Sequence, residues 1–338
     1  MKVAVLLSGG VDSSVAALLL KDQGYDVMGL TMVNWDIKVG EKAAEVARQL
    51  NIEHRIVDLT ELFKTRIIDY FCHSYEIGNT PNPCVECNKY IKFGALLDIA
   101  REAGCDRVAT GHYARIDFDG ERNRYLLRKG IDINKDQSYF LYGLKQEQLA
   151  NIIFPLGSLT KSEVRDIARQ RQVPVAESPD SQEICFVSGD YGDFIRDRVK
   201  FKSGEVMDTD MRIVGNHRGL PFYTVGQRRG LGISSSRPLY VVGMDLERNR
   251  LLVGGQEQLY QKTLHAGQNN FIYINHLDLP LQVEAKIRYR ANAAPATIYM
   301  ENNDRVRVEF VDPQRAITRG QSVVFYQKDY VLGGGIIE

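Results

Sequence analysis

A glycine-rich stretch near the N-terminus, residues 8–14, constrains the fold of this chain more than any other segment. The apolar run before it, residues 2–7, is typical of a strand, and residues 13–20 after it predict a buried helix. At such a junction, glycines let the backbone approach a ligand, and unpaired amides at the helix start point toward an anion. Asp12 adds a carboxylate able to hold a magnesium ion. The stretch therefore predicts a site for a nucleotide phosphate.

Two commoner nucleotide-binding patterns are absent here. A phosphate loop of the G-x-x-x-x-G-K type needs a lysine, but none follows Gly10 and the spacing is too short. The dinucleotide pattern G-x-G-x-x-G is also missing, which disfavours a nicotinamide or flavin enzyme. The remaining alternative is an ordinary strand-to-helix turn with a polar cap. We favour the phosphate site, since the glycines, Asp12 and the serines all fall where a phosphate would use them.

The bulk composition is that of an ordinary soluble globular protein, with 44% hydrophobic and 25% charged residues. A length of 338 residues predicts two or three domains. No apolar run approaches the length of a membrane span, and the N-terminus lacks a signal-peptide pattern, so we expect a cytoplasmic protein without a membrane partner. The formal net charge is zero, from 43 basic and 43 acidic residues, so any nucleic-acid surface must be local.

Strand-like runs at residues 26–32, 54–58 and 107–110 alternate with helical patterns such as 41–50. This alternation predicts a parallel sheet that is covered by helices on both faces. Ligands of such sheets bind beyond the carboxyl ends of the strands, where the glycine stretch and later strand ends should converge. Gly111 and His112 follow one of these strands, although a single histidine at a strand end is more often structural.

Five cysteines in a chain without an export signal favour reduced thiols, a metal site or redox chemistry over a disulfide framework. The prolines within residues 79–89 predict an irregular loop, followed by a helix from about residue 92. Cys87 lies near that helix start, where amides and Lys89 or Lys92 would favour its thiolate. Unremarkable thiols or half a zinc site are alternatives for Cys84 and Cys87, but no second C-x-x-C supplies further zinc ligands. Cys185 follows a polar loop, although a buried small hydrophobe would look similar.

The second half of the chain has a different character. Many glycines and short alternating segments predict β structure from about residue 201, and residues 240–244 and 250–253 are expected to form the arms of a hairpin. Short strands from residue 271 onward, including one at 283–290, predict a small β-barrel. In the first half of the chain, residues 135–138 are expected to open a helical stretch. We therefore expect domains at 1–200, 201–265 and 266–338. Residues 223–232 mix basic, aromatic and glycine residues in a manner suited to phosphate backbones, as would a solvated basic loop. The capping box at residues 160–163 is interpreted as purely structural.

Taken together, the motifs resemble the bacterial tRNA-specific 2-thiouridylase family, a group of ATP pyrophosphatases, along essentially the whole chain. The residues that carry this resemblance are SGGVDSS, NPCVECNK, GHYARI, KDQSYFL, the Cys185 segment, FYTVGQRRGLGI, KIRYR and VLGGGII. The resemblance implies an α/β fold: a parallel-sheet ATP-pyrophosphatase domain like the adenine nucleotide alpha hydrolases, a small central domain and a C-terminal β-barrel. It also implies that ATP and Mg²⁺ are used to adenylate the C2 oxygen of the wobble uridine, which sulfur then replaces.

The family's functional residues can be carried over by position. ATP contacts fall on Leu6, Leu7, Ser8, Gly9, Gly10, Val11, Asp12, Ser13, Met32 and Gly111, and Asp12 is also expected to be catalytic. The resemblance makes Cys87 the nucleophile and Cys185 the persulfide carrier. The target base is expected near Asn82, Pro83 and Cys84, and other tRNA contacts at His112, Lys135, Asp136, Gln137, Arg288, Tyr289 and Gln321.

One departure from the family concerns Cys84, where many members carry aspartate. Cys84, Cys87 and Cys185 are thus candidate ligands of an iron–sulfur (4Fe–4S) cluster with one open iron, which would replace the persulfide route. We favour the persulfide. Expected partners are tRNA, through its anticodon stem-loop, and a sulfur-donor protein such as a cysteine desulfurase or a relay carrier. The rival interpretations are a related pyrophosphatase that amidates a small metabolite and an inert RNA-binding protein.

Overall fold

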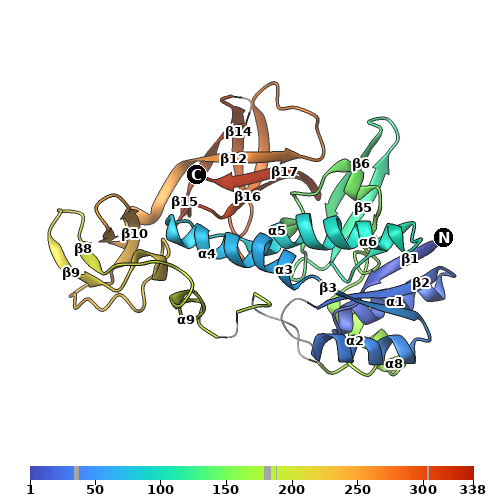
Figure 1. Cartoon of the computed structure of the whole chain (residues 1–338). Helices are drawn as coiled ribbons and strands as arrows, with labels where there is room; N and C mark the ends of the chain where they lie inside the picture. Colours follow the sequence, from blue (N-terminus) through green and yellow to red (C-terminus); the bar gives the residue numbers. More distant parts are fainter. Residues whose placement is uncertain (34–37, 179–183, 188, 303) are drawn as a thin grey trace.

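Five parallel strands form the first sheet of the protein (Figure 1). The computed structural model describes residues 1–33, 38–178, 184–187, 189–302 and 304–338. The strand order is β3-β2-β1-β4-β7, and the bounds are β1 Lys2–Leu6, β2 Asp26–Val33, β3 Glu53–Asp58, β4 Arg107–Ala109 and β7 Ile152–Ile153. Because β1 is central and covered on both faces, Val3, Ala4 and Val5 are fully buried. The predicted α/β class is confirmed.

Helices cover both faces of this sheet (Figure 1). On one face, α1 Val11–Asp22, α2 Lys38–Gln49 and α8 Lys161–Gln170 pack around Val5 and Val15. On the other, α6 Leu96–Glu102 packs against Ala4 and Met28. Two continuous helical runs contain wide π-helical turns: α3 Thr60–Phe63, η1 Lys64–Ile68 and α4 Asp69–Glu76, then α5 Pro83–Glu86, η2 Cys87–Ala95 and α6.

A small central sheet follows the first domain. Its strands are β8 Gly204–Met207, β9 Ile213–His217, β10 Tyr240–Asp245 and β11 Arg250–Gly254, in the order β10-β11-β8-β9. The antiparallel pairing of β10 with β11 confirms the predicted hairpin. Val206, Val241 and Leu251 share one apolar cluster with Phe71 of α4, so this sheet is anchored on the helical run that ends with α4.

The C-terminal part is a closed six-stranded antiparallel barrel. Its strands are β12 Tyr260–Phe271, β13 Leu281–Lys286, β14 Ala294–Met300, β15 Val306–Arg315, β16 Ser322–Gln327 and β17 Tyr330–Ile337. The order is β12-β15-β14-β13-β16-β17, and pairing of β12 with β17 closes the ring. The predicted barrel is thus confirmed. The proposed division at residue 265 falls within β12, and the domain limits 1–200, 201–265 and 266–338 remain predictions.

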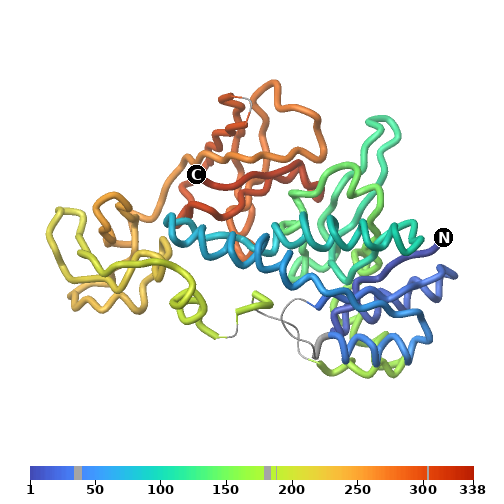
Figure 2. The backbone as a smooth tube through the Cα atoms, in the orientation of Figure 1, coloured from blue at the N-terminus to red at the C-terminus, as the bar shows by residue number. Residues whose placement is uncertain are grey.

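The barrel packs directly on the first domain, as the tube in Figure 2 shows for its orange and red segments above the cyan helices. Tyr139, in η3 Ser138–Phe140, donates its hydroxyl hydrogen to the Ser322 carbonyl oxygen at 2.8 Å. The hairpin of β5 Ala114–Asp119 and β6 Arg124–Lys129 extends the barrel sheet beside β17. α7 Gln146–Leu149 and α9 Tyr191–Arg196 complete the helices. Within the described residues, no helix has the length and apolar composition needed to span a bilayer.

Two local predictions differ from the structure. The stretch after Lys135 forms only the short η3, because the Asp136 carboxylate accepts hydrogen bonds from the backbone amides of Gly130 and Ser138 in place of helical bonds. The barrel strand expected to reach residue 290 ends at Lys286. After it, the chain turns, with the Ala291 amide bonded to the Arg288 carbonyl oxygen.

Candidate functional site

The glycine stretch forms a tight turn between β1 and α1. Ser13 Oγ accepts a hydrogen bond from the Ser8 amide at 3.2 Å and donates to the Gly10 carbonyl oxygen at 3.1 Å, so the turn is closed on itself. Gly9 has a φ of 70°, a left-handed conformation that favours glycine. Among the residues that the structure describes, no side chain caps α1, so its first amides are available to an anion.

Asp12 lies in the first turn of α1 and is already engaged. Its Oδ1 accepts hydrogen bonds from Lys161 Nζ at 2.6 Å and from the Tyr113 hydroxyl at 2.8 Å. Lys161 is the first residue of α8 and is only 8% exposed, although its helix starts with the predicted Thr160 capping box. Sequence analysis missed Lys161, since a capping box explains its position without function. The buried amine thus adds a positive charge beside the glycine turn.

The end of β4 passes directly over this turn. A Cβ atom at Gly111 would lie 2.7 Å from the Asp12 carbonyl carbon and 2.8 Å from the Ser13 amide nitrogen. Only glycine fits such an approach. Met32 lies at the carboxyl end of β2, half-buried. The structure therefore brings the predicted ATP-binding residues of three neighbouring strands to one edge of the sheet.

The cysteine pair lies on a helix that begins earlier than predicted. Asn82 is its N-cap and Pro83 its first residue, so Cys84 is in the first turn and Cys87 begins η2. Cys84 is exposed, whereas Cys87 is only 8% exposed. Burial raises the pKa of Cys87 to about 12. The expectation that exposed helix amides favour a Cys87 thiolate is therefore wrong, because Cys87 packs beside Ile91 and Phe71 in an apolar cluster.

Cys185 is held near this pair by the packing of the next residue, Phe186. Phe186 packs on the first helical run, with edge-on ring contacts to Phe63 of α3 at 5.7 Å and Phe71 of α4 at 5.3 Å, in the same cluster as Cys87. The charged form of Cys185 also raises the pKa of both Cys84 and Cys87, so the three thiols lie close enough to interact. Cys185 itself is in contact with solvent, yet surrounding protein raises its pKa.

Lys92 connects the thiols with the nucleotide turn. Its charge opposes the burial effect and lowers the pKa of Cys84, Cys87 and Cys185. It also contributes, after burial, to a His112 pKa well below the ordinary value. His112 is buried between Phe93 and Phe154 and shares a 2.7 Å hydrogen bond with Thr110 Oγ1. His112 directly follows Gly111, and its ring contacts Phe93 of η2, the element that begins with Cys87, so neighbouring elements link the turn to the thiol-bearing helix.

The sequence suggests two candidate metal groups, magnesium and an iron–sulfur cluster, and the residues present fit only the first. Magnesium needs only one or two carboxylates besides phosphate oxygens. Both described bonds to Asp12 end on Oδ1, so Oδ2 suits such an ion. In the described part of the chain, no three His, Cys, Asp or Glu side chains are grouped as metal ligands. Cys84, Cys87 and Cys185, as arranged here, therefore do not fit an iron–sulfur cluster.

The predicted tRNA residues divide into buried supports and surface groups. Asp136 and His112 are buried, and Gln137 Oε1 accepts from the Tyr113 amide at 3.0 Å. Gln321 donates to the Thr80 carbonyl oxygen at 2.9 Å, which fixes the barrel beside the loop of Asn82 and Pro83. Arg288 donates hydrogen bonds to the Ala316 carbonyl oxygen and to Thr318 Oγ1 of the barrel. The Tyr289 ring lies tilted against Phe140, with the ring centroids 4.4 Å apart, and Lys135 is half-buried.

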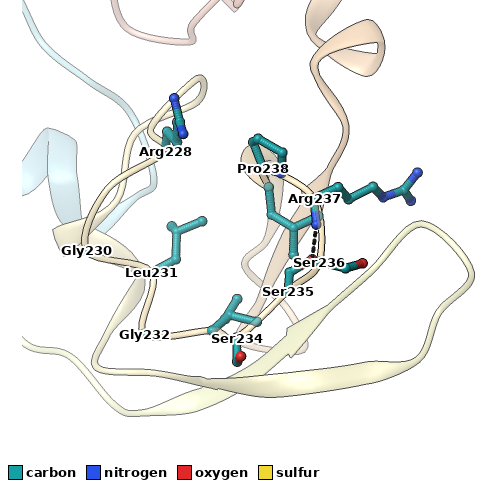
Figure 3. Close-up of a pocket in the computed structure, with 11 residues that line it drawn as sticks. Arg228, Gly230, Leu231, Gly232, Ser234, Ser235, Ser236, Arg237 and Pro238 are labelled. Carbon is teal, nitrogen blue, oxygen red and sulfur yellow. Dashed lines mark hydrogen bonds between the residues drawn. The ribbon is translucent and has the colours of Figure 1, made fainter.

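A separate surface feature lies in the central domain. Residues 228–239 form a loop around an open cavity of about 620 Å³ (Figure 3). Arg228, Arg229 and Arg237 of this loop are exposed, and Arg237 points outward in Figure 3. This cavity contains neither the thiols nor the glycine turn. Its exposed guanidinium groups match the predicted basic loop and suit phosphate oxygens.

Family models match almost the whole chain. Residues 1–189 match a "tRNA methyl transferase HUP domain", 192–255 a "tRNA methyl transferase PRC-barrel domain" and 261–337 an "Aminomethyltransferase beta-barrel domain". The chain is 55% identical over 337 residues to the tRNA-specific 2-thiouridylase MnmA of Syntrophomonas wolfei, covering 100% of both chains. The chain belongs to the tRNA-specific 2-thiouridylase family. The predicted resemblance is thereby confirmed.

Other 2-thiouridylases match at similar length. The chain is 50% identical to MnmA of Moorella thermoacetica, over 99% of this chain and 98% of that protein. It is also 50% identical to MnmA 2 of Thermoanaerobacter sp. (strain X514), over 100% and 98% respectively. Because the 2-thiouridylase match covers all three parts of the molecule, it includes the nucleotide turn, the thiol region and the barrel.

Proposed function

We propose that this protein uses ATP to activate the wobble uridine of tRNA and replaces its C2 oxygen with sulfur, forming 2-thiouridine. The observation that carries this proposal is the path from Asp12 through Gly111 and His112 to Lys92 and the thiols. A nucleotide turn next to sulfur nucleophiles suits a reaction that first adenylates an oxygen and then displaces it.

In the first step, the uridine O2 attacks the α-phosphorus of ATP and pyrophosphate leaves. Residues 6–13, Met32 and Gly111 bind the nucleotide in this proposal, and the free amides of α1 face its phosphates. Lys161 supplies a buried positive charge beside them. A magnesium ion held by Asp12 would neutralise phosphate charge. The step converts a poor leaving group, the carbonyl oxygen, into AMP.

In the second step, the terminal sulfur of a Cys185 persulfide attacks C2 and AMP leaves. The Cys87 thiolate then attacks Cys185 Sγ, which breaks the sulfur–sulfur bond, releases 2-thiouridine and leaves a Cys87–Cys185 disulfide. Lys92 assists because its positive charge favours each thiolate. A reductant reopens the disulfide, and a sulfur-donor protein recharges Cys185.

The tRNA is bound across the domains in this proposal. Its wobble base leaves the anticodon stack and lies near Asn82, Pro83 and Cys84. His112, Lys135, Asp136, Gln137, Arg288, Tyr289 and Gln321 form or support the surrounding contacts, and the exposed arginines of residues 228–239 contact phosphates. The cytoplasmic location expected from the sequence belongs to the same proposal.

The test measures pyrophosphate release and 2-thiouridine formation separately, with ATP, tRNA and persulfide-charged protein. Asp12→Ala is expected to abolish both products, because it removes the carboxylate of the nucleotide turn. Cys185→Ala should release pyrophosphate in a tRNA-dependent manner but form no 2-thiouridine. Cys105→Ala, at a buried thiol outside the cluster, is the control.

Three results would contradict the proposal. Equal loss of pyrophosphate release in Asp12→Ala and Cys185→Ala would show that adenylation at the turn and sulfur transfer at the thiols are not separate steps. Pyrophosphate release without tRNA would favour a small metabolite as substrate. Thiolation that requires iron and acid-labile sulfide in anaerobically purified protein would replace the persulfide with a cluster.

A further inference from the structure

Cys84 is a thiol that the proposed reaction leaves unused, although it lies beside the reacting cysteine. It precedes Cys87 by three residues on the continuous run of α5 and η2. On an α-helix, the Cα atoms of residues three apart lie about 5 Å from each other. Disulfides join cysteines whose Cα atoms are roughly 4.4–6.8 Å apart, so this pair can bond with a local adjustment that brings the two Cβ atoms about 1–2 Å closer.

We infer that Cys84 and Cys87 form a dithiol relay that frees Cys185 after each sulfur transfer. The inference rests on the proposed function. The Cys84 thiol gives its proton to solvent, and its thiolate attacks Cys87 Sγ in the Cys87–Cys185 disulfide. The old sulfur–sulfur bond breaks, Cys185 leaves as a thiolate, and a Cys84–Cys87 disulfide forms. An external dithiol later supplies two electrons, becomes oxidised and restores both thiols.

The positions of the three thiols favour this order. Cys87 is buried, so an external reductant must reach any disulfide that includes it through the partner sulfur, and both Cys84 and Cys185 are exposed. Transfer of the disulfide to Cys84, on the same helical run as Cys87, keeps an accessible partner for the reductant and releases Cys185. Meanwhile Cys185, on its own segment held by Phe186, is free to receive the next sulfur. Lys92 stabilises the departing Cys185 thiolate, as its effect on that thiol indicates.

The relay can be tested by trapping disulfides after one turnover. Persulfide-charged protein reacts with ATP and tRNA without reductant, is quenched in acid with a thiol-alkylating reagent, and is mapped by mass spectrometry. The wild type should contain a Cys84–Cys87 disulfide and an alkylated Cys185. In Cys84→Ala, any thiolation should end in a Cys87–Cys185 disulfide. With an external dithiol present, its later turnovers should be about tenfold or more slower than its own first turnover.

Cys105→Ala is the matched control and should give the wild-type map. Wild-type protein that has thiolated its tRNA yet retains only a Cys87–Cys185 disulfide would overturn the relay and leave the proposed function intact. Later turnovers of Cys84→Ala as fast as its first would also overturn it. If Cys84→Ala forms no 2-thiouridine, the wild-type map decides alone. Absence of 2-thiouridine from the wild type would overturn both proposals.

Discussion

The nucleotide turn and the thiol cluster are built in opposite ways. The turn consists of consecutive residues that Ser13 Oγ ties together through bonds to the Ser8 amide and the Gly10 carbonyl oxygen. Its carboxylate, on Asp12, accepts hydrogen bonds from Lys161 and Tyr113. The thiol cluster joins residues about a hundred positions apart, and loss of hydration to the surrounding protein raises the pKa of each thiol. Lys92 is the cation that opposes this effect at all three.

Because of this difference, the nucleotide turn is preorganised for its ligand, whereas the thiols are kept in a less reactive state. The turn has its amides and charges in place before a ligand arrives, which is how electrostatic preorganisation works. The thiols rest mainly in their neutral form, which reacts slowly with oxidants and disulfides. The two regions should therefore respond to different mutations, and each prediction below tests that independence.

Lys161→Met should have the largest effect. It removes the buried amine bonded to Asp12, and loss of one positioned charge typically lowers kcat by about 10²–10³. We expect that loss in tRNA-dependent pyrophosphate release, with unchanged alkylation rates of the thiols. Thr160→Val is the control, since it removes the cap of α8 but keeps the amine. It should cost about 1 kcal/mol of stability with little change in pyrophosphate release. Slower thiol alkylation in Lys161→Met would contradict the independence of the two regions.

Gly111→Ala should affect the turn next most strongly. The added Cβ would lie under 3 Å from Asp12 and Ser13, and such overpacking costs about 1–3 kcal/mol. When this free energy destabilises the conformation of the turn that binds ATP, the ATP affinity drops by roughly 5- to 150-fold. Titration with ATP measures it. Gly120→Ala is the matched control, because nothing lies within 4 Å of its Cβ position. Equal ATP affinities in both variants would show that the turn shifts to accommodate the added Cβ without loss of ATP binding.

The nucleotide turn and the parallel sheet were predictable because the sequence patterns that indicate them are local. The glycines follow a strand and precede a helix within fourteen residues, and alternating strand and helix patterns define the rest of the sheet. Lys161 was missed because its bond to Asp12 spans 149 positions, which no local pattern contains. The capping box at Thr160 was predicted correctly, but it gave Lys161 an apparently sufficient structural reason.

The thiol region was predicted less well, for two physical reasons. The prolines of residues 79–89 indicated an irregular loop, but Pro83 occupies the first position of a helix, where its missing N–H costs no hydrogen bond. The ionisation of Cys87 depends on burial under Phe71 and Phe186, which come from distant segments. The resemblance identified Cys87 and Cys185, but only the fold reveals that Lys92 acts on both.

Lys92→Gln should have a moderate effect, confined to the thiols. Without this cation the pKa of each of the three thiols rises further, so the thiolate fraction near neutral pH falls. We expect alkylation of Cys185 to slow by about three- to tenfold at pH 8, with wild-type ATP affinity. Lys92→Arg should restore the rate. Lys89→Gln, on the same η2, is the control, since the Lys89 amine lies over the Tyr90 ring, 4.8 Å from its centroid. A rate unchanged in Lys92→Gln would remove Lys92 from the thiol chemistry.

His112 links the two regions, and its titration gives the smallest and sharpest test. Burial, with a contribution from Lys92, lowers the pKa of His112 well below 6.5. The native state therefore keeps it neutral, whereas the unfolded chain protonates it below about pH 6.5. Its contribution to stability is present above that pH and is lost as the pH falls. The NMR signal of His112 should stay constant between about pH 8 and 5.5. Since Lys92→Gln removes one lowering charge, the His112 pKa should rise in that variant. A His112 signal that shifts over this pH range in the wild type would mean that water and protons reach the path between turn and thiols.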